Sequence, residues 1–311
     1  MLTNLFVFVA ALGLVIKGST MATTYAGRFA ESLGISKYAV GFMVVAIISI
    51  LPETFIAINS ALNGVSAFGL GMLFGSNIAD LTLVFALMVF YAGRSLKVES
   101  KVLRNQALYP FILILPLLLG LDGQYTRVEG AVLVVMGLLF YHSTLRHART
   151  LSSVTTSSRR AHYQSLFLLI GSTVLMVVGA HFTVTSATAI AQAFRVSPVL
   201  IGMLVVSLGT TMPELFFGLK SVRTKEDGLA VGDMLGTVLA DATVVVGILA
   251  LIQPFTFPRQ IIYITGAFMV VAAFVLFQFM RSGRSISRRE ATLLLGFWLV
   301  FVLVEFVAAA A

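Results

Sequence analysis

The sequence contains no cysteine and only four histidines among its 311 residues. Without cysteine, the chain forms neither disulfides nor metal sites based on thiolates. Charge is scarce as well, because Asp, Glu, Lys and Arg make up 11% of the chain while 59% of it is hydrophobic. A soluble domain of this length could not cover so much apolar surface, so the composition predicts a polytopic membrane protein.

Long hydrophilic stretches are also missing, apart from one near the middle of the chain (Arg146–Gln164). About ten segments reach the roughly 20 apolar residues that a spanning helix needs. They lie near residues 2–23, 38–62, 66–92, 105–121, 128–145, 164–188, 197–220, 229–252, 260–280 and 290–309. We therefore expect an all-α polytopic membrane protein, with residues 1–145 and 164–311 as two five-helix groups joined by a basic linker, 146–163. The first segment lacks a basic start and a cleavage pattern, which favours a retained helix.

The two halves match each other at a constant offset. Glu53 and Glu214 are 161 residues apart, and so are Asp80 and Asp241. Several glycines align at the same offset, as do Pro52 with Pro213 and Glu129 with Glu290. Chance alignment of glycines is easy in an apolar chain, but chance would hardly align both pairs of acids. The pattern indicates an internal duplication.

An odd number of spans in each half would make the second half enter the membrane from the opposite side. The prediction is therefore ten transmembrane helices in two inverted repeats, an arrangement typical of secondary transporters. The net charge of +8 comes from basic residues that lie mostly in short connections, where they set topology rather than bind nucleic acid. With both termini outside, nearly all of them fall on the cytoplasmic side; the exceptions include Arg127, Arg195 and Arg259.

Glu53, Asp80, Glu214 and Asp241 all lie within apolar segments. A carboxylate in the bilayer centre costs roughly 2.5–3.5 kcal/mol on insertion scales, so each needs a proton or a cation. A single acid of this kind is often a buried carboxyl that hydrogen-bonds a neighbouring helix, but a duplicated pair favours cation binding. Proline before each glutamate removes a helical hydrogen bond and frees carbonyl oxygens.

Oxygen-bearing side chains surround these acids. Hydroxyls lie in the turn before each glutamate and one turn before each aspartate, and Asn77 adds an amide. The hydroxyl residues are Ser49, Thr210, Thr211, Ser76 and Thr237. A set of oxygens with several carboxylates and no Cys or His suits a hard cation such as Ca²⁺ or Na⁺.

These motifs resemble those of the calcium/cation antiporters, the family that includes the Na⁺/Ca²⁺ exchangers. The family's repeats carry a pattern close to A-x-G-T-S-x-P-E followed by G-S-N-x-x-N/D, and here Ser207–Leu215 and Gly75–Asp80 match it well. Ala46–Thr54 and Gly236–Asp241 match in part. The resemblance covers nearly the whole chain and implies a ten-span fold and an antiport function.

The resemblance also implies roles for individual residues. Glu53 and Glu214 would be the central Ca²⁺ ligands, facing each other where the second and seventh spans meet. The Ca²⁺ and Na⁺ sites would be completed by Ser49, Thr210, Thr211, Ser76, Thr237, Asp80, Asp241 and the carbonyls of Ala46 and Ser207. Ca²⁺ and Na⁺ would be the transported ions, with no organic cofactor.

The chain departs from the family pattern at several positions. Ile48 and Ile50 stand where the family has Gly and a hydroxyl residue, Val238 replaces an Asn, and Asp233 stands where Asn is common. Both trailing positions are acidic, although exchangers often have an amide at one or both. Fewer hydroxyls and more carboxyls leave coupling to H⁺ or K⁺ open beside Na⁺, since neighbouring carboxyls raise one another's pKa.

Other functions are less consistent with the sequence. Ala230–Asp233 comes close to the G-x-G-D pattern of intramembrane aspartyl proteases, but the required Gly is Ala230, no Tyr-Asp pair is present, and the repeat stays unexplained. A cation channel is a second alternative, although inverted repeats favour alternating access. We therefore expect a transporter and not an enzyme, in a prokaryotic plasma membrane, with the lipid bilayer as its surroundings and no obligate protein partner.

Overall fold

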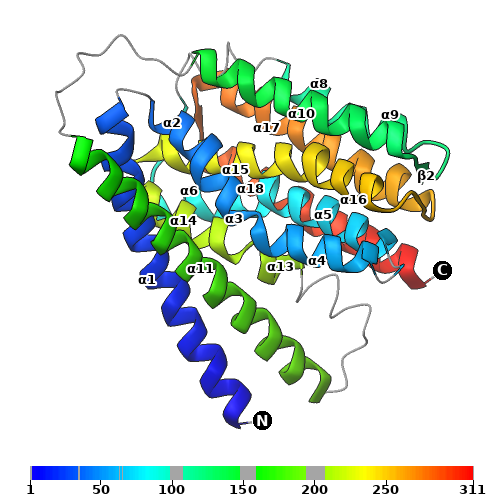
Figure 1. The fold of residues 1–311 in the computed structure, drawn as a ribbon, viewed down its shortest axis with the longest axis horizontal. Helices are drawn as coiled ribbons and strands as arrows, with labels where there is room; N and C mark the ends of the chain where they lie inside the picture. The colour runs from blue at the N-terminus through cyan, green and yellow to red at the C-terminus, as the bar shows by residue number, and fades with distance from the viewer. Residues whose placement is uncertain are drawn as a thin grey trace. The chain divides into compact units, whose positions relative to one another are not determined.

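The computed structural model describes residues 2–33, 36–62, 64, 66–98, 108–147, 159–193 and 207–310. Helices dominate these residues, as the composition predicts (Figure 1). The described strands form two short antiparallel pairs, β1 (Leu96–Lys97) with β4 (Ser285–Ile286) and β2 (Gln124–Tyr125) with β3 (Phe255–Thr256). The predicted helical class is therefore confirmed.

Six described helices are long and apolar enough to cross a membrane, and each coincides with a predicted span. They are Thr3–Ala30, Ser66–Ala92, Tyr163–Thr183, Asp227–Ile252, Ile261–Gly283 and Arg288–Ala308. Among the other predicted spans, 128–145 lies in one helix, α10 (Arg127–His147), and 38–62 is interrupted at Ile50. Segments 105–121 and 197–220 lie partly outside the described residues. The count of ten spans remains a prediction.

Two helices extend well beyond their predicted ends. These are α1 (Leu2–Leu33) and α11 (Arg159–Ala193). In α1 the helix continues through a polar stretch whose hydroxyls bond to carbonyls of their own helix. Thr23 Oγ1, for example, donates to Ser19 O at 2.9 Å. Such internal bonds satisfy polar side chains in apolar surroundings, which a count of apolar residues does not register.

The described chain divides into two compact units that differ from the predicted halves. The first unit comprises Met1–Pro52 and Ala148–Thr237, and the second comprises Glu53–His147 and Val238–Ala311. Each unit therefore contains segments from both halves of the sequence. The predicted linker 146–163 is helical at both ends, because α10 ends at His147 and α11 begins at Arg159.

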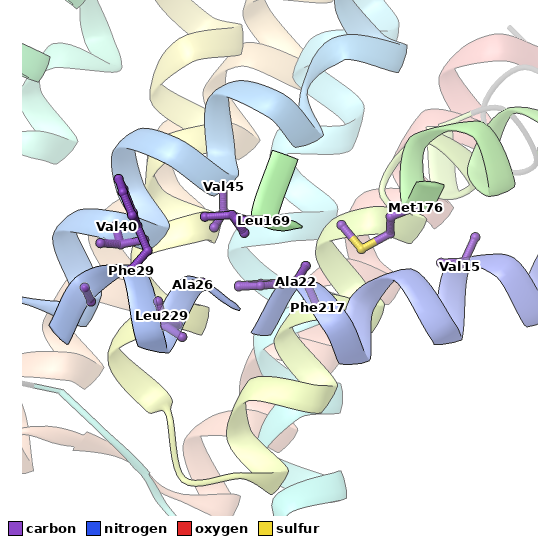
Figure 2. Close-up of a cluster of buried hydrophobic side chains, with 11 residues drawn as sticks. Val15, Ala22, Ala26, Phe29, Val40, Val45, Leu169, Met176, Phe217 and Leu229 are labelled. Atoms are coloured by element: carbon purple, nitrogen blue, oxygen red, sulfur yellow. The ribbon is translucent and has the colours of Figure 1, made fainter. Parts of the chain in front are cut away.

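In the first unit, α1 and α11 lie side by side over much of their lengths (Figure 1). Glycines permit this approach. A Cβ on Gly18 would lie 2.9 Å from Ser172 O, and a Cβ on Gly179 would lie 3.0 Å from Ala11 O. Small residues bring helix backbones together in this way in membrane proteins. Figure 2 shows buried apolar side chains of α1 (Val15 and Ala22), of α11 (Met176) and of the neighbouring helices (Phe217 and Leu229).

The first unit also contains the shorter helices α2 (Lys37–Val40), η1 (Gly41–Val45), α3 (Ala46–Ser49), α13 (Ser207–Thr210) and α14 (Met212–Arg223). The start of α4 (Leu51–Leu62) and most of α15 (Asp227–Leu239) belong to this unit as well. The helix from α2 to α3 touches α15 through glycines. A Cβ on Gly41 would lie 2.3 Å from Leu229 O, and a Cβ on Gly232 would lie 2.2 Å from Tyr38 O.

The second unit contains two long helices with π-helical sections. One runs through α5 (Ser66–Ala79), η2 (Asp80–Val84) and α6 (Phe85–Ala92), and the other through η4 (Ala240–Val245) and α16 (Val246–Ile252). α10 packs along η4 and α16, where Gly130 and Gly247 approach closely. Its other helices are α8 (Tyr109–Ile112), α9 (Ile114–Leu119), η5 (Ile261–Gly266), α17 (Ala267–Gly283) and α18 (Arg288–Ala310). α17 packs against α5 and η2, and α18 packs along α6.

The local structure repeats at the offset found in the sequence. α3 and α13 have corresponding bounds, as do α4 and α14, and α10 and α18 begin at corresponding residues. Both of the latter begin with a capping box. Glu129 accepts the Thr126 backbone N–H at 2.8 Å, and Glu290 accepts the Ser287 backbone N–H at 2.7 Å. The alignment of Glu129 with Glu290 thus reflects a repeated helix start and supports the duplication.

Candidate functional site

Two helix breaks lie immediately before the Pro-Glu pairs. Ile50 separates α3 from α4 with φ −71° and ψ −2°, and Thr211 separates α13 from α14 with φ −71° and ψ −4°. In both halves the proline follows two residues later, where it has no N–H to continue the helical ladder. The predicted interruption is therefore present in both halves, with nearly the same backbone conformation.

In each broken turn, two groups donate hydrogen bonds to the same backbone carbonyl oxygen. Ser207 O accepts the hydroxyls of Thr210 at 3.0 Å and Thr211 at 3.1 Å. Ala46 O accepts the Ser49 hydroxyl at 3.3 Å and the Ile50 N–H at 3.1 Å. A hydroxyl that donates its proton keeps its lone pairs for a cation. Both turns therefore gather neutral oxygens, and the second turn has one hydroxyl more than the first.

Each broken turn leads directly to a buried glutamate. Glu53 is 1% exposed in α4, and Glu214 is fully buried in the first turn of α14. Within the first unit, Glu214 follows the turn that carries Thr210 and Thr211. A carboxylate held at such depth needs a compensating charge or proton.

In the second unit, three of the predicted carboxylates act on one another. Glu53 and Asp80 are 1% exposed and Asp241 is fully buried, and the charges of Glu53 and Asp80 both act on Asp241. Neither carboxylate oxygen of Asp241 has a hydrogen-bond partner among the described residues. Neighbouring buried carboxylates cannot all stay ionised without a counter-charge. The arrangement therefore attracts a cation or holds a proton.

Both trailing aspartates lie at π-helical sections. η2 begins at Asp80, and η4 contains Asp241 as its second residue. Thr82 Oγ1 donates to Ile78 O at 2.5 Å, and Thr243 Oγ1 donates to Leu239 O at 2.6 Å. Each section therefore contains an equivalent hydrogen bond from a threonine side chain to the backbone. π-helical turns occur often at functional sites. Apolar periodicity does not predict these turns.

The remaining predicted ligands line the helices before these aspartates. Ser76 is buried and donates to Leu73 O at 3.1 Å, and Asn77 donates to Met269 Sδ at 3.6 Å. Asn77 Oδ1 and Thr237 Oγ1 have no hydrogen-bond partner among the described side chains and backbone. Both atoms are thus buried acceptors that a cation could use.

One acid outside the predicted set contacts a predicted ligand, Ser49, within the first unit. Asp233 is fully buried in α15, and its Oδ1 accepts the Ser49 hydroxyl at 3.2 Å. It lies one helical turn before Thr237, on the same face of the helix. Its occurrence within an apolar segment was visible in the sequence, whereas its contact with Ser49 was not.

The structure divides the predicted ligands between the two units. The first unit holds Ala46, Ser49, Ser207, Thr210, Thr211, Glu214 and Thr237, and the second holds Glu53, Ser76, Asn77, Asp80 and Asp241. Within the described part of the chain, no three acidic or histidine side chains form a ready-made metal cluster. His181 and Lys17 are exposed on α11 and α1, apart from these groups. Glu305 accepts the Thr265 hydroxyl.

Comparison with known proteins places this geometry in a wider group. The family model described as "Sodium/calcium exchanger protein" matches residues 3–142 and 164–307. Inner membrane protein YrbG of Escherichia coli (strain K12) is 28% identical, over 82% of this chain and 81% of that protein. Sodium/calcium exchanger MaX1 of Methanosarcina acetivorans is 20% identical, over 97% of this chain and 98% of that protein.

The fold also has a close structural counterpart. The sodium-calcium exchanger NCX_Mj, soaked with 10 mM Na⁺ and zero Ca²⁺, has a TM-score of 0.86 to this chain at 23% sequence identity. The similarity covers 96% of this chain and 98% of that one. At this identity the likeness establishes the fold, while the family model spans both halves of the sequence. The chain therefore belongs to the sodium/calcium exchanger protein family, and it is an integral membrane antiporter that transports cations.

Proposed function

We propose that this chain exchanges Ca²⁺ for Na⁺ across a membrane by alternating access, with ten transmembrane helices in two inverted repeats. The observation that carries the proposal is the repeated turn at Ile50 and Thr211, each followed by a buried glutamate. Buried carboxylates, hydroxyls and carbonyls form the all-oxygen environment that Ca²⁺ and Na⁺ prefer. The name of the relative MaX1, a sodium/calcium exchanger, points the same way.

In this proposal Glu53 and Glu214 are the principal Ca²⁺ ligands. Asp80, Asp241, Asn77, the hydroxyls and the two turn carbonyls complete the Ca²⁺ and Na⁺ positions. Because the two ions share oxygens, binding of one displaces the other, and this competition couples their movements. No organic cofactor and no enzymatic step enter the cycle.

The basic residues supply the proposed orientation. Both termini lie outside and the central connection lies in the cytoplasm, because Lys and Arg accumulate in cytoplasmic connections. This orientation is the one expected for a prokaryotic plasma membrane. Ca²⁺ would leave the cell while Na⁺ enters.

Coupling to H⁺ or K⁺ is the second candidate, and a specific observation favours it. The first turn has Ile50 where the second has Thr211, so the first turn has one hydroxyl fewer than the second. Asp80 and Asp241 are both acidic and close enough for their charges to interact. Fewer neutral oxygens and more carboxylates suit a coupling ion other than Na⁺.

Ca²⁺ flux into proteoliposomes tests both candidates. The purified chain is reconstituted, and a Na⁺, K⁺ or pH gradient is imposed in turn. Flux driven by Na⁺ supports the first candidate, flux driven by pH or K⁺ alone supports the second, and the absence of gradient-driven flux refutes exchange. Glu214→Gln should abolish flux, whereas Asp122→Asn, which alters an exposed loop carboxylate, should retain it.

A further inference from the structure

We infer that Asp233 is a further cation ligand, which together with Ser49, Thr237 and the Ala46 carbonyl forms a position for a monovalent coupling ion, Na⁺. The inference rests on the proposed exchange function and adds a residue to it. All four groups belong to the first unit.

Asp233 is deeply buried and has a carboxylate oxygen that is available to bind a cation. Its side chain is fully buried, and Oδ1 accepts the Ser49 hydroxyl at 3.2 Å. Its second oxygen, Oδ2, has no hydrogen-bond partner among the described residues. Buried carboxylates are costly unless paired or bound to a metal. One hydroxyl does not satisfy this group, so an acceptor position remains for a cation.

Close helix packing brings the other oxygens to this carboxylate. A Cβ on Gly236 would lie 2.6 Å from the Ala46 Cβ and 2.4 Å from Phe42 O, so α15 and the helix leading to α3 are in backbone contact here. The single Ser49 hydroxyl lies within hydrogen-bond distance of both Ala46 O, at 3.3 Å, and Asp233 Oδ1, at 3.2 Å. Thr237 follows Asp233 by one turn, and its buried Oγ1 has no hydrogen-bond partner in the described chain.

The chemistry of this group of oxygens favours a monovalent ion. It contains one carboxylate, two hydroxyls and a carbonyl, so its formal charge balances one positive charge. Ca²⁺ sites usually contain more carboxylates and six to eight oxygens. Absence of Cys and His from the group excludes the softer transition metals as good fits.

The duplication shows that Asp233 is specific to one repeat. Its counterpart 161 residues earlier is Met72, whose side chain has no oxygen. Conversely, the first turn has Ile50 where the second has the hydroxyl of Thr211. Asp233 therefore supplies an oxygen to the turn that lacks one, from a helix of the other half of the sequence.

Asp233→Asn separates a ligand from a structural acceptor. Asparagine keeps the oxygen that accepts the Ser49 hydroxyl, but it removes the charge that balances the ion. If Asp233 binds Na⁺, the half-saturating Na⁺ concentration for Ca²⁺ flux should rise by about tenfold or more, as losses at metal sites commonly do. The half-saturating Ca²⁺ concentration should change by less than about threefold, since the Ca²⁺ ligands remain.

Two measurements decide the assignment. The first is Na⁺-driven Ca²⁺ flux in proteoliposomes for wild type, Asp233→Asn and the control Asp122→Asn. The second is Na⁺ protection of the purified protein against thermal denaturation, which needs no transport and should be lost selectively in Asp233→Asn. An unchanged Na⁺ dependence with retained protection overturns the assignment, and so does an equal loss of Ca²⁺ and Na⁺ affinity. A wild-type protein without Na⁺-dependent flux refutes the proposed exchange itself, a result visible before any variant is made.

Discussion

Gly232→Ala is expected to push two helices apart at the site. A Cβ at this position would lie 2.2 Å from Tyr38 O and 2.8 Å from Phe42 N, both of them backbone atoms. Carbon–oxygen contacts are normally about 3.3 Å or longer, so relief requires a separation of roughly 1 Å between α15 and the α2–η1 helix. Rotation of a side chain cannot supply it.

The magnitude follows from two opposing effects. Overpacking costs about 1–3 kcal/mol, and a clash with backbone belongs at the upper end of that range. Alanine regains up to about 1 kcal/mol through its helix propensity. The net loss of stability should therefore be about 2 kcal/mol, which corresponds to a fall of roughly 3 °C in the thermal midpoint of a chain of this length. The hydrogen bond of 3.2 Å between Ser49 and Asp233 would lengthen beyond bonding range.

The duplication supplies a matched control. Gly71 is the counterpart of Gly232, and a Cβ there meets no atom of the described residues within 4 Å. Both alanine variants are heated in detergent at one scan rate, because unfolding of such proteins is commonly irreversible, and the folded fraction is measured by fluorescence-detected size exclusion. Equal midpoints for Gly232→Ala and Gly71→Ala would refute the packing argument.

Three further predictions concern single side chains. Ile50→Thr restores the hydroxyl found at Thr211 and should lower the half-saturating Na⁺ concentration in the flux assay; an unchanged value would contradict a role for this turn in Na⁺ binding. Ser287→Ala removes the capping hydroxyl of α18 and should cost about 1 kcal/mol, seen as a lower thermal midpoint; no shift would mean that the cap is dispensable. The Tyr125 hydroxyl donates to Pro116 O at 2.6 Å. Burial raises the pKa of Tyr125, and the nearby carboxylates Glu129 and Asp122 raise it further. Since the folded state retains this proton, the contribution of Tyr125 to stability should be constant below about pH 10, the ordinary tyrosine pKa, and should decline above it; Tyr125→Phe should reduce the alkaline loss of stability relative to wild type.

The features that sequence predicts here follow from local chemistry. Proline lacks an N–H wherever it occurs, so the breaks at Ile50 and Thr211 could be placed from the positions of the prolines. The repeat offset survives in the structure because equal local sequences begin and end helices alike, as the paired capping boxes show. Local rules thus account for the turns and for the predicted hydroxyl and carbonyl oxygens within them.

The contact between Ser49 and Asp233 could not be predicted in the same way. It joins residues 184 positions apart, and it depends on how closely glycines allow two helices to approach. The π-helical sections at Asp80 and Asp241 could not be predicted from the sequence either, since one extra residue in a turn hardly changes an apolar pattern over five or six residues. The contact between Ser49 and Asp233 therefore arises from tertiary packing rather than from local preference.

The paired glycines of α1 and α11 have a mechanical consequence. Gly18 faces the backbone of α11, and Gly179 faces the backbone of α1, so each helix fits into the other at two separate heights. Displacing one helix alone would drive a backbone against its neighbour at both places. We therefore expect α1 and α11 to move together as one rigid pair of helices.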